Sequence, residues 1–122
     1  MIFTGISRDF DLANEDQYNT IGAFWDEMTL KYGLEQLIGL GYKWQGGKIS
    51  YAIGLKHGDI DGCNFTSELP DDGWQTVRGK TNDLKQIYDE IYKNGALDLE
   101  LEVFYENGDC EISYYRNSHF SC

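Results

Sequence analysis

Residues 98–115, with the sequence DLELEVFYENGDCEISYY, are typical of a β-hairpin. Asn107-Gly108 predicts a two-residue turn of type I′, because both central positions of that turn need positive φ. Side chains alternate along a strand, so one face of the first strand would carry Leu99, Leu101, Val103 and Tyr105. The other face would carry Asp98, Glu100, Glu102, Phe104 and Glu106. The hairpin therefore raises a functional question, whether this acidic face is solvated or whether Glu102 receives a cation.

The predicted pairing across the turn bears on that question. It sets Phe104 opposite Glu111 and, further along, Glu100 opposite Tyr115. Two aromatic side chains would then flank Glu102 on a face that is otherwise polar. A strand with alternating charge usually has one solvated face, which is the simpler interpretation. The flanking aromatic residues favour a ligand-binding role for Glu102 instead.

Two segments show the spacing of amphipathic helices. The first stripe of apolar residues runs from Tyr18 to Tyr32, and Asn14 with Gln17 forms a capping-box pattern before it. The second stripe runs from Leu84 to Tyr92. Residues 34–39 either extend the first helix or form a short separate turn.

The order strand, helix, hairpin occurs twice. The predicted strands are 2–7, 41–44 and 48–55 in the first unit, and 74–80, 99–105 and 110–115 in the second. The units are pseudo-repeats 1–55 and 73–118, and the polar segment 56–72 with Pro70 is the predicted linker. This pattern predicts an α+β fold with an antiparallel sheet, both helices on one face and a ligand groove on the other.

Composition excludes several classes of function. The 122 residues suffice for a single domain, 1–122, and contain 10 Lys+Arg against 21 Asp+Glu, a formal charge of −11. This charge opposes binding to nucleic acid or to an anionic membrane. Cys63, Cys110 and Cys122 show no CxxC spacing, and the start lacks a signal-peptide pattern, so a reduced, cytoplasmic protein is expected. The histidines lack partners at metal-binding spacing, no cofactor is expected, and a homodimer is left open.

Several short stretches resemble one family. AFWDEM at 23–28, YAIGL at 51–55, GWQTV at 73–77 and LEVF at 101–104 resemble the GyrI-like effector-binding domain, which occurs alone or fused to AraC-type regulators. The resemblance implies a central pocket for cationic, lipophilic ligands, with Glu102 as the matching pocket glutamate. Many members have Tyr where this chain has Phe104, so one pocket hydroxyl would be missing. No helix-turn-helix segment is recognised, so a stand-alone binding domain is expected.

The remaining candidates follow from position or from the resemblance. Trp25 lies on the helical stripe, where aromatic residues usually belong to the core, and Trp74 would lie at the mouth of the groove. The repeat pattern assigns Tyr51 to the core, whereas the resemblance favours ligand contact for this hairpin. Glu100 competes with Glu102 as the pocket carboxylate. The predicted ligand-binding residues are Glu102, Phe104, Trp74, Tyr115, Trp25, Glu100 and Tyr51.

These observations predict a non-enzymatic protein that binds small cationic, lipophilic or amphipathic molecules. Two alternatives stay open at this point. One is a hydrolase that acts on a small natural product in the same pocket, with a glutamate that activates water. The other is an acidic interaction or inhibitor module that covers the basic site of a partner protein.

Overall fold

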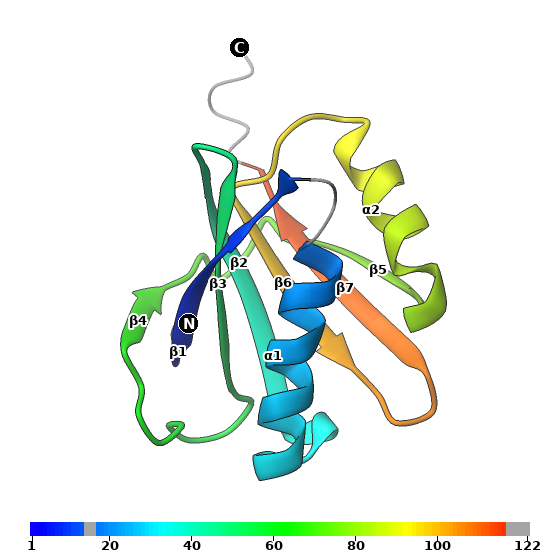
Figure 1. The fold of residues 1–122 in the computed structure, drawn as a ribbon. Coiled ribbons are helices and arrows are strands. Elements are labelled where there is room, and N and C mark those ends of the chain that lie inside the picture. The colour runs from blue at the N-terminus through cyan, green and yellow to red at the C-terminus, as the bar shows by residue number, and fades with distance from the viewer. Residues whose placement is uncertain (14–16, 117–122) are drawn as a thin grey trace.

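The computed structural model describes residues 1–13 and 17–116 of the chain. Within these ranges, seven strands form one antiparallel sheet in the order β4-β1-β3-β2-β6-β7-β5 (Figure 1). The strands are β1 (Ile2–Asp11), β2 (Leu37–Gln45), β3 (Lys48–Leu55), β4 (Phe65–Glu68), β5 (Gln75–Lys80), β6 (Leu99–Phe104) and β7 (Asp109–Tyr115). The helices are α1 (Gln17–Tyr32) and α2 (Leu84–Tyr92). The predicted α+β class with an antiparallel sheet and two helices is confirmed.

Both helices pack on one face of the sheet, called here the helix face (Figure 1). Trp25 of α1 donates a hydrogen bond to Tyr51 of β3, and Tyr88 of α2 donates one to Glu102 of β6. Residues 34–36, whose structure the sequence left open, form a 3-10 turn that leads directly into β2. Asn14, the predicted cap of the first helix, lies outside the described residues.

The other face of the sheet is also apolar around β1, β2, β3 and β6. Its core contains Phe3, Leu40, Ala52, Leu69 and Leu101. This finding corrects the sequence prediction, which put Glu102 and the ligand groove on the face away from the helices. The apolar face of β6 packs against the N-terminal strand and the linker segment, so the acidic face is the one that the helices cover.

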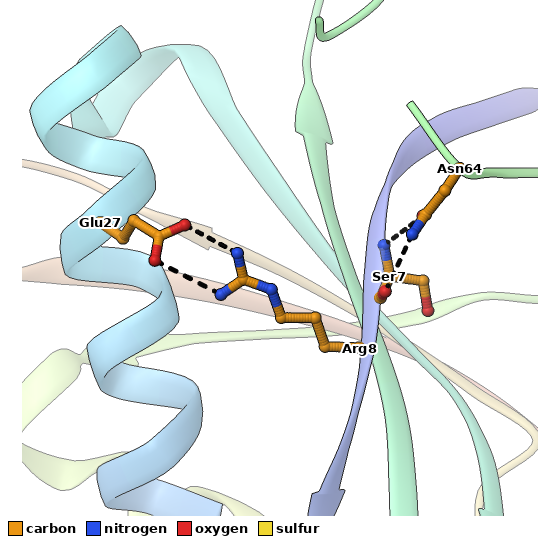
Figure 2. Close-up of polar contacts among 4 residues, drawn as sticks. All are labelled: Ser7, Arg8, Glu27 and Asn64. Atoms are coloured by element: carbon orange, nitrogen blue, oxygen red, sulfur yellow. Dashed lines mark hydrogen bonds and ion pairs between the residues drawn. The ribbon is translucent and has the colours of Figure 1, made fainter. Parts of the chain in front are cut away.

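The linker 56–72 contains β4, which the sequence did not predict and which pairs with the edge of β1. Just before β4, the Asn64 side chain bonds the backbone of Ser7: Oδ1 accepts from the Ser7 amide at 2.7 Å, and Nδ2 donates to the Ser7 carbonyl at 3.3 Å (Figure 2). From the next position of β1, Arg8 reaches Glu27 of α1 with an N–O distance of 2.7 Å. These contacts connect β1 to both the linker and the first helix.

The second hairpin has a different turn from the predicted one. The Gly108 amide donates to the Tyr105 carbonyl at 3.0 Å, and the Tyr105 amide donates to the Asp109 carbonyl at 2.9 Å. The loop thus has three residues, with Gly108 at φ 91°. Asn107 stabilises it, because its Oδ1 accepts from the Asp109 amide at 2.9 Å.

This longer loop shifts the register by one residue. Phe104 lies opposite Cys110 and Glu100 lies opposite Tyr114, whereas the predicted partners were Glu111 and Tyr115. A shift of one residue moves every side chain of β7 to the other face. Tyr115 therefore does not flank Glu102. The first hairpin turns through two residues, Gly46 at φ 62° and Gly47 at φ 74°.

Candidate functional site

A cavity of about 510 Å³ lies between the two helices and the helix face of the sheet. It is lined by residues of both helices and of strands β2, β3 and β6. Its aromatic lining consists of Tyr18, Trp25, Trp44, Tyr51, Tyr88, Tyr92, Phe104 and Tyr105. Two carboxylates from β6, Glu100 and Glu102, also line it. A volume of this size accommodates a small organic molecule.

Glu102 lies at the centre of a hydrogen-bond network. Its side chain is 4% exposed, and the hydroxyls of Tyr51 and Tyr88 donate to its Oε1 and Oε2, respectively. Trp25 Nε1 donates in turn to the Tyr51 hydroxyl at 2.8 Å. The two helices thus each contribute to holding one carboxylate of the sheet. Trp25 also packs edge-on against Phe104, with ring centroids 4.8 Å apart.

Glycines on the neighbouring strand make space for this network. Gly39 of β2 pairs with Glu102, and a Cβ there would lie 2.1 Å from the Tyr51 hydroxyl oxygen and 2.7 Å from the Trp25 ring. Gly41 pairs with Glu100, and a Cβ there would lie 2.8 Å from Glu100 Cγ. Any larger residue at either position would push a site residue away from its place.

Glu100 has a different set of partners. It is also 4% exposed, and its Oε2 accepts a hydrogen bond of 3.1 Å from the hydroxyl of Tyr92. Tyr92 stacks on Tyr88, with ring centroids 5.7 Å apart, and is itself 40% exposed. The donor to Glu100 therefore reaches from the solvent surface into the cavity.

Burial raises the pKa of both carboxyl groups, and the causes differ between them. For Glu102, hydrogen bonds from Tyr51 and Tyr88 work against the effect of burial. For Glu100, burial raises the pKa most, and the nearby charge of Glu102 raises it further, against hydrogen bonds from Tyr92 and Tyr88. Burial also raises the pKa of the Tyr51 and Tyr88 hydroxyls, so they stay protonated as donors. Glu100, whose pKa is raised further, is therefore the carboxyl of the pair that holds a proton more readily.

No protein cation balances these carboxylates within residues 1–13 and 17–116. The ion pairs of this part of the chain lie at the surface, for example Arg8 with Glu27 and Arg78 with Glu111. A buried carboxylate that lacks a cationic partner is costly. The described residues therefore supply no positive charge to pair with the carboxylates of this site.

Five of the seven predicted site residues come together in the cavity: Glu102, Glu100, Phe104, Trp25 and Tyr51. Trp74 and Tyr115 do not. They pack on each other on the opposite face, with ring centroids 5.7 Å apart, and Trp74 Nε1 donates to the Pro70 carbonyl at 2.8 Å. The prediction for Trp74 assumed a groove on that face, and the prediction for Tyr115 depended on the wrong register.

Sequence reasoning missed five aromatic residues of the cavity: Tyr18, Trp44, Tyr88, Tyr92 and Tyr105. Tyr88 and Tyr92 were recognised only as members of a helical stripe. A signal was available, because phenol hydroxyls on the buried side of a helix need a hydrogen-bond partner. The alternating glycines of LIGLGYKW, residues 37–44, were a second signal, since glycine within a strand often marks a close approach.

Comparison with protein-family models, curated proteins and solved structures finds no match to this chain. The resemblance to GyrI-like domains thus stays a prediction. In the described ranges, no helix has the length and apolar character needed to span a membrane. The same residues contain no group of three or more His, Cys, Asp and Glu side chains suited to a metal ion.

Proposed function

We propose that this chain is a non-enzymatic binding protein for small cationic, lipophilic molecules. One observation carries the proposal: Glu100 and Glu102, each 4% exposed, line an aromatic cavity in which no cation of the described residues pairs with them. The class of protein that suits this site is the GyrI-like effector-binding domain. We propose that the chain acts as a stand-alone member of that class, within the cytoplasm.

The physical chemistry favours a lipophilic cation over other ligands. A cation that enters the cavity supplies the missing partner of a desolvated carboxylate. Aromatic faces add cation–π attraction of about 0.5–2 kcal/mol each when desolvated. A neutral analogue gains only the apolar contacts. Inorganic cations lack the apolar bulk that fills a cavity of about 510 Å³, so they should bind weakly.

The strand order supports a duplicated architecture of the GyrI-like kind. The order β1-β3-β2-β6-β7-β5 has the same pattern from either end when β1, β2 and β3 are equated with β5, β6 and β7. The halves would then be related by a pseudo-twofold axis between β2 and β6. Glu102 of β6 pairs with Gly39 of β2 at this junction. The carboxylate would therefore lie where the two halves meet, as the resemblance implies.

A matched pair of probes tests the proposal. N-benzylpentan-1-amine is cationic at neutral pH, and benzyl pentyl ether has an oxygen in place of the ammonium group. Isothermal titration calorimetry should show clear binding of the amine and at least about tenfold weaker binding of the ether. Glu102→Gln should remove this preference, whereas Glu106→Gln, an exposed control on the same hairpin, should retain it. Equal binding of amine and ether, or no binding of either, would refute the proposal.

A hydrolase is the second candidate, and one observation favours it. Glu100 and Glu102 have unequal surroundings in one cavity, and a protonated carboxyl beside an ionised one can serve as general acid and general base. Mass spectrometry of bound probes separates the two candidates, because hydrolysis adds the mass of one water across a cleaved bond. Recovery of an ester-containing cationic ligand intact, after prolonged incubation with the protein, supports the binding function.

A further inference from the structure

The two carboxylates of the cavity are held in unlike ways. Both oxygens of Glu102 accept hydrogen bonds from buried phenols, which fixes this side chain as a counter-charge. Glu100 accepts from Tyr92, whose ring is 40% exposed. Glu100 and Glu102 are two residues apart on one strand, so their Cα atoms are separated by about 7 Å on the same face. The cavity thus presents two carboxyl groups from positions two residues apart on one strand.

We infer that the cavity is suited to a ligand with two cationic centres, one paired with Glu102 and the other with Glu100, and that a ligand with one cationic centre leaves a proton on Glu100. This inference rests on the proposed function and names its ligand class. The Cα separation of about 7 Å is comparable to the distance between two ammonium groups joined by a short alkyl chain.

Among the described residues, no cation forms a hydrogen bond or ion pair with Glu100. The groups that face it are Glu102 on β6, Tyr88 and Tyr92 on α2, and Tyr114 opposite it on β7. Across the cavity lie Tyr51 of β3 and Asp26 and Tyr18 of α1. Each of these is neutral or anionic, and Gly41 of β2 carries no side chain. The guanidinium of Arg116 lies over the Tyr114 ring, 5.1 Å from its centroid, but donates to the carbonyls of Ile91 and Gly95. Within the described residues, a proton is therefore what neutralises Glu100 while the cavity is empty.

The proton balance distinguishes the two ligand types. A dication ionises Glu100, and the carboxyl proton passes to the buffer as the second ammonium takes its place. One proton is released for each dication bound, so affinity rises by about tenfold per pH unit while Glu100 is protonated. A monocation pairs with Glu102, and the proton stays on Glu100. Its affinity should depend little on pH in the same range.

Two probes of equal size test this balance. N-benzyl-1,4-diaminobutane carries two ammonium groups, and N-benzylpentan-1-amine has a methyl group in place of the terminal ammonium. Calorimetry at about pH 7, in buffers of different ionisation enthalpy, measures the protons released on binding. The diamine should release close to one proton and bind roughly tenfold or more tightly than the monoamine. The monoamine should release none.

Variants separate this inference from the proposed function. Glu100→Gln, which mimics the protonated carboxyl, should abolish both the proton release and the preference for the diamine over the monoamine. Glu106→Gln should change none of these. Equal affinity of the two amines without proton release would overturn the inference and leave the proposed function intact. Failure of both amines to bind would reject the proposed function itself, and the wild-type measurement decides even if a variant folds poorly.

Discussion

Gly39 of β2 lies opposite Glu102 of β6, and the missing side chain of Gly39 is what allows the Tyr51 hydroxyl to reach the Glu102 carboxylate. The same space admits the Trp25 ring, which donates to Tyr51. One glycine therefore makes room for the buried chain of hydrogen bonds from the first helix to the central carboxylate.

Gly39→Ala tests this relationship. The added methyl would meet the Tyr51 hydroxyl and the Trp25 ring, so we expect a loss of about 1–3 kcal/mol in the free energy of unfolding, as overpacking typically causes. Urea denaturation measures the loss. Gly22→Ala is the control for stability, because a Cβ there meets nothing within 4 Å and alanine favours a helix. A Gly39→Ala protein as stable as wild type would show that the site has no need of this space.

The stability of the empty protein should depend on pH through Glu100. Its folded pKa lies above the unfolded value of about 4.3, so its stabilising effect is present below that value and is lost as pH rises through the folded pKa. The melting temperature of wild type should therefore fall relative to that of Glu100→Gln as pH rises above about 4.3. Parallel curves for the two proteins would mean that Glu100 is ionised throughout.

Tyr88→Phe should weaken both the fold and the site. It removes a hydroxyl that donates to buried Glu102, and a buried acceptor left with fewer donors costs about 1–3 kcal/mol. Monoamine affinity should also fall, because loss of this hydrogen bond raises the pKa of Glu102 and so disfavours its charged form. Tyr114→Phe is the matched control, since its hydroxyl bonds Gln75 at the surface, and it should change the unfolding free energy by less than about 0.5 kcal/mol. Equal effects of the two variants would argue against the network.

Tryptophan fluorescence should report ligand binding from the helix face alone. Trp25 and Trp44 line the cavity, whereas Trp74 packs against Tyr115 on the opposite face. We expect the fluorescence change on titration with N-benzylpentan-1-amine to persist in Trp74→Phe and to decrease in Trp25→Phe. Loss of the signal in Trp74→Phe would place the ligand on the face away from the helices and would contradict the proposed site.

The sequence was sufficient to single out Glu102 and to find the long elements. A glutamate between Leu101 and Val103, on a face shared with Phe104, is unusual for a solvated strand, and the strand after Gly46-Gly47 has the predicted bounds, Lys48–Leu55. The face of β6 that the helices cover was harder to predict. Both of its faces carry large apolar or aromatic residues, and the choice depends on where Phe3 and Leu69 pack from distant parts of the chain.

The register of the second hairpin shows a similar limit. Asn-Gly favours a two-residue turn, but it is equally compatible with a three-residue loop in which only Gly108 has a positive φ. The bond from the Asp109 amide to the Asn107 side chain favours the longer loop. This single residue decides whether Tyr115 or Tyr114 shares the face of Glu100, so one local choice changed a predicted site residue.

The affinity of Glu102→Gln for N-benzylpentan-1-amine, measured by calorimetry beside wild type and Glu106→Gln, tests the central claim most directly. The amide keeps the shape of the side chain and removes the charge. We expect a loss of about 2–5 kcal/mol in binding free energy, roughly thirtyfold to several-thousandfold in affinity. The loss should persist at about 0.5 M NaCl, where the diffuse field of surface charge is screened. Small and equal losses in the two variants, both abolished by salt, would contradict the claim that Glu102 is the counter-charge of the cavity.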